Sequence, residues 1–387
     1  MKFDVVICGA AMSGATLALA LARVAGKKVA IIDPHPPSNE RSGFDARSIA
    51  LSYGTIQKLK QFQLWEGLQP QASSILSIHV SDRGHYAQTG FDAKEMGQAY
   101  LGAVVELEKA GQVYFQQLHS EPNITLYCPD SLESVVQFDE LVEIKLSGGE
   151  TLHAELLVGA DGTGSKVAEQ VQVSNKVQQL RQYALIANIE LANPHKGVAY
   201  ERFTSNGPLA LLPMTEQRMS LVWCLSHEQL QQAQSWDDDT FLNKLQQEFG
   251  WRLGKFIKVG SRSNYPLALY TRERLTHHRV AFVGNAAQTL HPIAGQGFNL
   301  GIRDVAALTH AVAECDDAGS YECLKMYRNS RVQDRDATIA MTTGLVRLFS
   351  NNWYPTVVAR NLGLLAFDAI PPLQGCVTNR SLGLIKN

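Results

Sequence analysis

The pattern of hydrophobic positions changes character twice within the first 33 residues. A short β-branched run at 5–7 gives way to small residues at 9–14, and an Ala/Leu-rich stretch then extends to residue 22. After a basic interval, a second β-branched run occupies 29–32. Short β-branched runs are typical of buried strands, whereas glycine marks turns and an apolar Ala/Leu stretch favours a helix. The pattern therefore predicts a strand, a turn, a helix and a second strand.

The same stretch contains eighteen consecutive residues, 5–22, without a charged side chain. That is about the length at which an apolar run becomes a candidate membrane span. A span has no need of the turn at 9–14, and a signal peptide would have a shorter apolar centre and a cleavage site before the mature domain. We therefore favour the strand, turn and helix interpretation over both alternatives.

Glycine residues give this turn a candidate chemistry. Gly9 allows a tight turn out of the strand, and Gly14 allows the helix to pack closely on the sheet. The helix N-terminus would present free N–H groups to a pyrophosphate, and Asp33 at the end of the second strand can accept hydrogen bonds from an adenosine ribose. Ala11 replaces the second glycine of the usual dinucleotide fingerprint, so we expect a slightly more distant phosphate. A similar unit without a ligand is the alternative.

Two later segments have the same strand-and-turn character. The strand expected at 156–159 ends in a Gly-Ala-Asp sequence, where Asp161 can either reach a cofactor or cap the following helix. A strand that ends at Gly284 places Asn285 outside the carboxyl end of the sheet, and Gly295 and Gly297 lead into a helix whose N-terminus favours an electron-rich group. Alternatively, His291 is a loop histidine without chemistry.

The remaining pattern separates a strand-rich region from a helical one. Alternating segments between 171 and 269 predict antiparallel strands, in which we interpret Phe203, Met214 and Trp223 as core residues. After residue 306 the pattern is mainly helical, and an apolar region at 345–367 can face a lipid tail, a membrane surface, a partner or the protein's own domains.

Composition narrows the class of protein. The 387 residues are 45% hydrophobic and 19% charged, which excludes an intrinsically disordered chain. A net charge of −2 gives no reason to expect nucleic-acid binding. The six cysteines are widely spaced, without the spacing of metal ligands, so we expect no metal site and reduced thiols of a cytoplasmic protein.

Together, the three glycine-containing segments resemble the signatures of the flavoprotein aromatic hydroxylases, also called class A flavin monooxygenases. The chain is most similar to the ubiquinone-biosynthesis branch of that family. The segments that carry this closer resemblance are 43–51, 79–85, 203–210, 249–255 and 284–301. Asn285 and Gln288 depart from the broader family, which usually has Asp and His at these two positions.

The resemblance implies an α/β fold in which a β-sheet substrate domain is interleaved with a Rossmann-like FAD-binding domain, followed by a helical C-terminal region. The FAD-binding domain would be discontinuous. Its expected residues are 1–75, 101–170 and 270–310, those of the β-rich substrate domain are 76–100 and 171–269, and those of the helical region are 311–387.

The resemblance also implies a set of FAD-binding residues. These are Gly9, Ala11, Gly14, Asp33, Arg47, Asp161, Gly284, Asn285, Gly295, Gly297, Phe298 and Asn299. Arg47 would approach the phosphates or the flavin, although an ordinary surface ion pair is its alternative. His291 and Pro292 would shape the oxygenation site at the edge of the flavin.

The implied reaction is the hydroxylation of an electron-rich phenol, in which NAD(P)H reduces FAD and the reduced flavin captures O₂ as a hydroperoxide. In the ubiquinone branch the expected substrate is 2-octaprenyl-6-methoxyphenol, converted to the corresponding 1,4-benzoquinol. A sister ring hydroxylase, a hydroxylase of a small soluble phenol and a flavin-binding assembly subunit with little turnover are the alternatives. Expected partners are the prenylated phenol, O₂ and other ubiquinone-biosynthesis proteins, with peripheral membrane contact.

Overall fold

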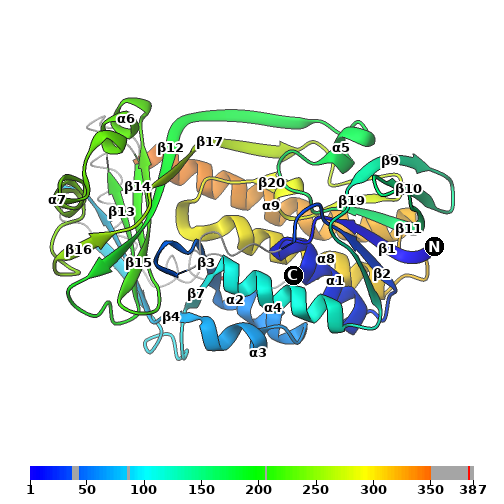
Figure 1. Ribbon diagram of the computed structural model, residues 1–387, viewed down its shortest axis with the longest axis horizontal. Coiled ribbons are helices and arrows are strands. Elements are labelled where there is room, and N and C mark those ends of the chain that lie inside the picture. Colours follow the sequence, from blue (N-terminus) through cyan, green and yellow to red (C-terminus); the bar gives the residue numbers. More distant parts are fainter. Residues whose placement is uncertain (37–42, 85–87, 205–206, 350–381, 384–387) are drawn as a thin grey trace.

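The computed structural model describes residues 1–36, 43–84, 88–204, 207–349 and 382–383 (Figure 1). The N-terminal prediction is confirmed: β1 (Lys2–Cys8), α1 (Met12–Val24) and β2 (Val29–Ile32) follow one another. Every residue of α1 from Gly14 to Ala22 is buried, which explains why this part of the sequence has no charge. The uncharged run is therefore a core strand and a core helix.

A mainly parallel sheet contains this unit. Its strand order is β18, β19, β11, β1, β2, β8, and β10 and β9 extend it from β11. The further strands are β8 (Ile124–Tyr127), β9 (Leu132–Gln137), β10 (Val142–Leu146), β11 (Thr151–Gly159), β18 (Thr276–His277) and β19 (Val280–Phe282). Because β1, β2, β11 and β19 run parallel, the three glycine-containing segments leave the sheet at the same edge. Helix α1 packs against α4 (Leu107–Ser120) and α8 (Gln296–Ala313).

A second sheet of nine described strands is mainly antiparallel, with order β20, β17, β12, β15, β14, β13, β5, β6 and with β16 paired to β12. These strands are β5 (Ser77–Asp82), β6 (Gln88–Asp92), β12 (Asn175–Leu191), β13 (Val198–Thr204), β14 (Gly207–Pro213), β15 (Arg218–Leu225), β16 (Phe256–Val259), β17 (Ser263–Arg272) and β20 (Gln288–Thr289). Figure 1 shows β12 and β17 extending from this sheet toward α5 (Lys166–Gln170) in the other half of the molecule.

Helices α6 (His227–Ser235) and α7 (Asp238–Phe249) contribute to the core of the second sheet. Their Leu230, Phe241 and Leu245 form one apolar cluster with Trp223 of β15. Trp223 is thus a core residue, as interpreted from the sequence. Met214 is also buried, in a different cluster beside the small sheet described next.

A small sheet joins the two large ones. It consists of β3 (Ser48–Ser52), β7 (Gly102–Glu106) and β4 (Ser73–Ile75), and it is accompanied by α2 (Tyr53–Gln61) and α3 (Trp65–Leu68). Glu106 at the end of β7 forms a buried ion pair of 2.7 Å with Arg218 of β15. The amide of Asn188 donates to the carbonyl oxygens of Phe44 and Ala46, both at 2.7 Å. These contacts attach β3 and β7 to the second sheet.

The described C-terminal part is helical through α9 (Tyr321–Phe349), which packs on α8. The apolar residues predicted at 350–367 lie outside the described residues. Leu382 is nearly fully buried, and its carbonyl accepts a 2.7 Å hydrogen bond from the N–H of Gly54 at the start of α2. Within the described ranges, no helix combines the length and the apolar character needed to cross a membrane.

Candidate cofactor and substrate site

A cavity of about 1500 Å³ lies between the two large sheets. One wall is formed by the turn after β1, the end of β2, the turn after β11 and the first turn of α8, and the opposite wall by the inner face of the second sheet. Typical ligand pockets have volumes of roughly 300–1,000 Å³. The cavity is therefore large enough for a dinucleotide and a second molecule.

The turn between β1 and α1 depends on two glycines. Gly9 has φ +103°, and a Cβ there would lie 2.5 Å from the carbonyl oxygen of Ala160. A Cβ on Gly14 would lie 1.8 Å from the carbonyl oxygen of Gly9. Ala11 occupies the N-cap position of α1 and provides no side-chain hydrogen bond. In this part of the chain the first N–H groups of α1 thus have no capping side chain, and Gly9 and Ala11 line the cavity while Gly14 packs behind them.

Asp33 lines the cavity at the end of β2, and its carboxylate also holds the neighbouring turns. Its Oδ2 accepts a 2.6 Å hydrogen bond from the N–H of Ala10, and its Oδ1 accepts one of 2.8 Å from the N–H of His35. Each carboxylate oxygen can accept more than one hydrogen bond. Asp33 can therefore hold the turn and bind a ribose hydroxyl at the same time.

Asp161 combines the two roles that the sequence left open. Its Oδ2 accepts a 3.1 Å hydrogen bond from the N–H of Val167 in the first turn of α5, which is a capping contact. Its Oδ1 is buried and has no hydrogen-bond partner among the described residues, although Asp161 lines the cavity. A buried acceptor without a donor is unfavourable, so this oxygen is suited to a ligand hydroxyl.

Arg47 lines the same cavity from the segment before β3. Its Nε lies 3.7 Å from Oε1 of Glu108, and its side chain remains 56% exposed. An ion pair that long and that exposed contributes little to stability. The guanidinium is thus able to approach an anionic group in the cavity.

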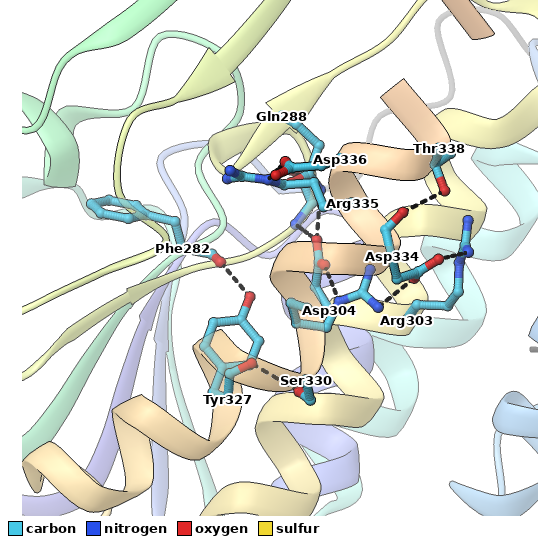
Figure 2. A network of polar contacts seen from close by, with 12 residues as sticks. Phe282, Gln288, Arg303, Asp304, Tyr327, Ser330, Asp334, Arg335, Asp336 and Thr338 are labelled. Atoms are coloured by element: carbon cyan, nitrogen blue, oxygen red, sulfur yellow. Dashed lines mark hydrogen bonds and ion pairs between the residues drawn. The ribbon is translucent and has the colours of Figure 1, made fainter. Parts of the chain in front are cut away.

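The loop after β19 is held from behind by a buried polar network (Figure 2). Asp304 of α8 accepts hydrogen bonds from the N–H of Gly284 at 3.2 Å and from Nε2 of Gln288 at 2.6 Å. Its other oxygen accepts from Nε of Arg331 at 2.8 Å, and Arg331 also pairs with Asp334. Gly284 has φ +60°, and the side chain of Asn285 is exposed and lines the cavity.

Sequence reasoning did not find Asp304, Arg331 or Asp334. Asp304 is completely buried and Arg331 nearly so. Burial alone would lower the pKa of the Arg331 guanidinium, but the charges and hydrogen bonds of Asp304 and Asp334 raise it. The available signal was an acidic residue at 304 on the buried face of an amphipathic helix, between Leu300 and Leu308.

The first turn of α8 begins at Gly295, whose φ of +59° is a left-handed conformation. Gly297 and Phe298 line the cavity, and a Cβ on Gly297 would meet no atom within 4 Å. Asn299 also lines the cavity, but its side chain is engaged with backbone. It accepts from the N–H of Ser52 and donates to the carbonyls of Ala50 and Gly295, so it attaches α8 to β3.

His291 and Pro292 differ in their access to the cavity. Pro292 lines it, whereas His291 is not among its described lining residues and is only 3% exposed. Its Nδ1 accepts from the N–H of Ile293, and its Nε2 lies 3.8 Å from Sγ of Cys224. Burial lowers the pKa of His291 from 6.5 to about 4. The imidazole is therefore neutral at pH 7 and lies behind the cavity wall.

These features fit FAD. A turn that excludes a Cβ, two helix N-termini at one cavity and an unpaired buried Oδ1 on Asp161 match a pyrophosphate, a flavin and their hydroxyl groups. No group of three or more His, Cys, Asp or Glu side chains within the described residues could hold a metal ion.

Comparison with known proteins defines the class. A family model described as an FAD binding domain matches residues 2–342. The chain therefore belongs to the flavoprotein aromatic hydroxylases, and it is an FAD-dependent aromatic-ring monooxygenase with NAD(P)H as co-substrate. The α/β fold with its FAD-binding domain agrees with this assignment.

Named relatives place the chain in the ubiquinone-biosynthesis branch. It is 34% identical to ubiquinone hydroxylase UbiL of Rhodospirillum rubrum, over 99% of this chain and 90% of the relative. It is 32% identical to 3-demethoxyubiquinol 3-hydroxylase of Escherichia coli, over 98% of each. The p-nitrophenol 4-monooxygenase PnpA of Pseudomonas putida has the same fold, with a TM-score of 0.80 at 16% identity over 98% of each chain.

Proposed function

We propose that the chain hydroxylates the ring of a polyprenylated phenol, converting 2-octaprenyl-6-methoxyphenol to the corresponding 1,4-benzoquinol in ubiquinone biosynthesis. The observation that carries this proposal is the apolar character of the cavity on its substrate side. Side chains from β5, β13, β14, β15, β17, α9 and the C-terminal turn contribute. They are Ile78, Val80, Phe203, Leu212, Val222, Leu267, Leu345, Leu348 and Leu382. An apolar wall of this extent suits a prenyl chain better than a small polar phenol.

Phe203 illustrates the dual use of this wall. We interpreted it from the sequence as a core residue, and it does pack with Ile293 and Val346 in a buried cluster. It also lines the cavity, next to Leu345 and Leu348 of α9. The same side chains can therefore stabilise the contact between α9 and the second sheet and bind an apolar ligand.

We assign the cofactor to the opposite wall. Gly9, Ala11 and Gly14 form the pyrophosphate turn, Asp33 and Asp161 accept ribose or ribityl hydroxyls, and Arg47 approaches the phosphates. Gly284, Asn285, Gly295, Gly297 and Phe298 surround the flavin, and Asn299 holds α8 in place. When bound, FAD supplies the redox chemistry that joins NAD(P)H oxidation to oxygen insertion.

The protein's own contribution is placement and electrostatics. The N-terminus of α8 favours negative charge on the group that it faces. Asn285 supplies a neutral hydrogen-bonding group where a carboxylate is usual in the family. Pro292 limits the space at the flavin edge, and the apolar wall excludes water from the reacting centre. His291 supports Pro292 from behind.

Delivery of so apolar a substrate suggests where the protein works. We propose a cytoplasmic enzyme that contacts the membrane peripherally and associates with other ubiquinone-biosynthesis proteins. The apolar residues 353–367 are the segment that we assign to such a contact, and they lie outside the described residues. Vesicle co-sedimentation of the full chain, compared with a variant carrying Asp in place of Leu364 and Leu365, tests this assignment.

The substrate is tested by disrupting the gene in its ubiquinone-making host and identifying the accumulated intermediate by mass spectrometry. Accumulation of 2-octaprenyl-6-methoxyphenol supports the proposal. Accumulation of 3-demethoxyubiquinol instead would assign the chain to the reaction named for its Escherichia coli relative, which is the second candidate. Unchanged ubiquinone with turnover of a soluble phenol by the purified protein would contradict both.

A further inference from the structure

One acidic side chain lies in the apolar wall of the cavity. Glu201 of β13 is paired with Val80 of β5 on one side and with Ala210 of β14 on the other. The same row continues through Val222 of β15 to Ile186 of β12. All five residues line the cavity. The row therefore crosses five strands on the inner face of the sheet, and Glu201 is its single polar member.

The neighbouring rows have the same apolar character around this position. Successive residues of a strand alternate between faces, so Ala199 and Phe203 share the face of Glu201. Both line the cavity. The other described carboxylates of the lining, Asp33 and Asp161, lie on the cofactor wall. Among the described residues, the substrate wall thus contains one carboxylate.

The carboxylate is set into the wall. Its Oε1 is buried, and the residue as a whole is partly exposed. Burial raises the pKa of the nearby Cys224 thiol, and the charge of Glu201 raises it further, which places this charge within reach of the inner face of β15. Charged groups in apolar surroundings are unfavourable unless donors meet them, and perturbed groups of this kind concentrate at functional sites.

We propose that Glu201 binds the phenolic hydroxyl of the substrate and accepts its proton during hydroxylation. This inference rests on the proposed phenolic substrate. An ionised carboxylate only accepts hydrogen bonds, and a phenol has one to donate. In the step, the phenolic O–H bond breaks, its electron pair stays on the phenol oxygen, and the proton forms an O–H bond with the carboxylate. No electron is exchanged, and the ring becomes more electron-rich.

Position supports this assignment over other cavity residues. His291 lies behind the wall, and Ser220, one row away, is neutral and does not take a phenolic proton at pH 7. The apolar neighbours Val80, Ala210 and Phe203 leave the ring and its alkyl substituents in an apolar environment while the hydroxyl meets the carboxylate. Glu201 is therefore a catalytic residue in this proposal.

The test compares Glu201→Gln and Glu201→Leu with wild type and with the control Glu190→Gln. Glu190 lies on β12 of the same sheet, is partly exposed and is not among the described lining residues. FAD-loaded proteins are given 2-octaprenyl-6-methoxyphenol in detergent, and product formation and NAD(P)H oxidation are followed from pH 6 to pH 10. FAD content and the thermal midpoint of each variant are measured as well.

We expect Glu201→Gln to retain FAD and stability but to lose hydroxylation by about 100-fold at pH 7, the scale of a lost general base. Its rate should recover as the pH approaches the phenol's own pKa of about 10. NAD(P)H oxidation should become uncoupled from product formation. Glu201→Leu should raise KM in addition, because the hydrogen bond is also lost, and Glu190→Gln should match wild type.

Two outcomes overturn the proposal in distinguishable ways. A Glu201→Gln protein with the wild-type rate and pH profile would remove Glu201 from the chemistry while leaving the proposed function intact. A wild-type protein that binds FAD yet hydroxylates neither this phenol nor 3-demethoxyubiquinol would refute the proposed function, and the role of Glu201 with it.

Discussion

The side-chain amide of Gln288 donates a 2.6 Å hydrogen bond to Oδ2 of Asp304, and this contact ties the loop after β19 to helix α8 (Figure 2). Asp304 also receives Arg331 of α9, so one buried carboxylate links the cofactor loop to two helices. The broader family usually has His where this chain has Gln288. An amide donates at every pH, so the loop is held without a titrating group.

Replacing Gln288 by Leu tests this link. The change leaves a buried carboxylate with one donor fewer, which costs about 1–3 kcal/mol of folding free energy. We expect a lower urea midpoint and weaker FAD retention, because Asn285 is held by the same loop. Gln232→Leu on the exposed side of α6 is the matched control and should change neither property. A Gln288→Leu protein with wild-type stability would show that Asp304 does not depend on this donor.

Gly14 tests the turn between β1 and α1. A Cβ there would meet the carbonyl of Gly9 at 1.8 Å, so the backbone must move in Gly14→Val. Overpacking of this kind costs about 1–3 kcal/mol or more. We expect the purified variant to contain little FAD, measured by flavin absorbance per chain. Gly344→Val, where a Cβ would meet nothing within 4 Å, should retain FAD. Normal retention by Gly14→Val would refute the close approach of α1 to the turn.

Parts of this site follow from sequence because they depend on local chemistry and on one rule of topology. Gly9, Asp161 and Gly284 each follow a buried parallel strand, and parallel strands of one sheet end at the same edge. Glu201 was not found in this way, because its row is created by pairing between β13 and the distant β5. Similarly, Asn299 reads as a cofactor ligand until Ser52 and Ala50 are placed beside it.

The open space beside Gly297 gives a sharper test of the cofactor position. In Gly297→Ala the new methyl group meets no protein atom within 4 Å, and alanine favours a helix over glycine by roughly 0.5–1 kcal/mol. The FAD-depleted variant should be as stable as wild type or more stable. Its FAD dissociation constant should nevertheless rise at least about tenfold, a change of 1.4 kcal/mol, because the methyl occupies space that we assign to the flavin.

Gly344→Ala is the matched control for this change. It also adds a methyl group in open space on a helix, but α9 presents residue 344 to solvent. It should have the same small effect on stability and leave FAD affinity unchanged. If fluorescence titration finds wild-type affinity in both variants, the flavin does not approach the first turn of α8.

The buried His291 makes stability depend on pH in a defined window. Its folded-state pKa of about 4 lies below the ordinary value of 6.5 because burial disfavours the charged ring. The unfolded chain therefore binds the proton more readily, and stability falls as the pH decreases from 6.5 to about 4. Linkage gives a loss of about 3 kcal/mol across this window, with no contribution above pH 6.5. Urea unfolding at pH 7.0, 5.5 and 4.5 measures it.

His291→Asn isolates this contribution, because the amide oxygen can accept the hydrogen bond from Ile293 without titrating. The variant should lose less stability than wild type on acidification, while other titrating groups act equally in both proteins. His119→Asn on the exposed side of α4 should keep the wild-type pH dependence. Because the neutral imidazole lies behind Pro292, hydroxylation by His291→Asn at pH 7 should remain within a few-fold of wild type. A loss of the size expected for Glu201→Gln would instead make His291 the proton acceptor.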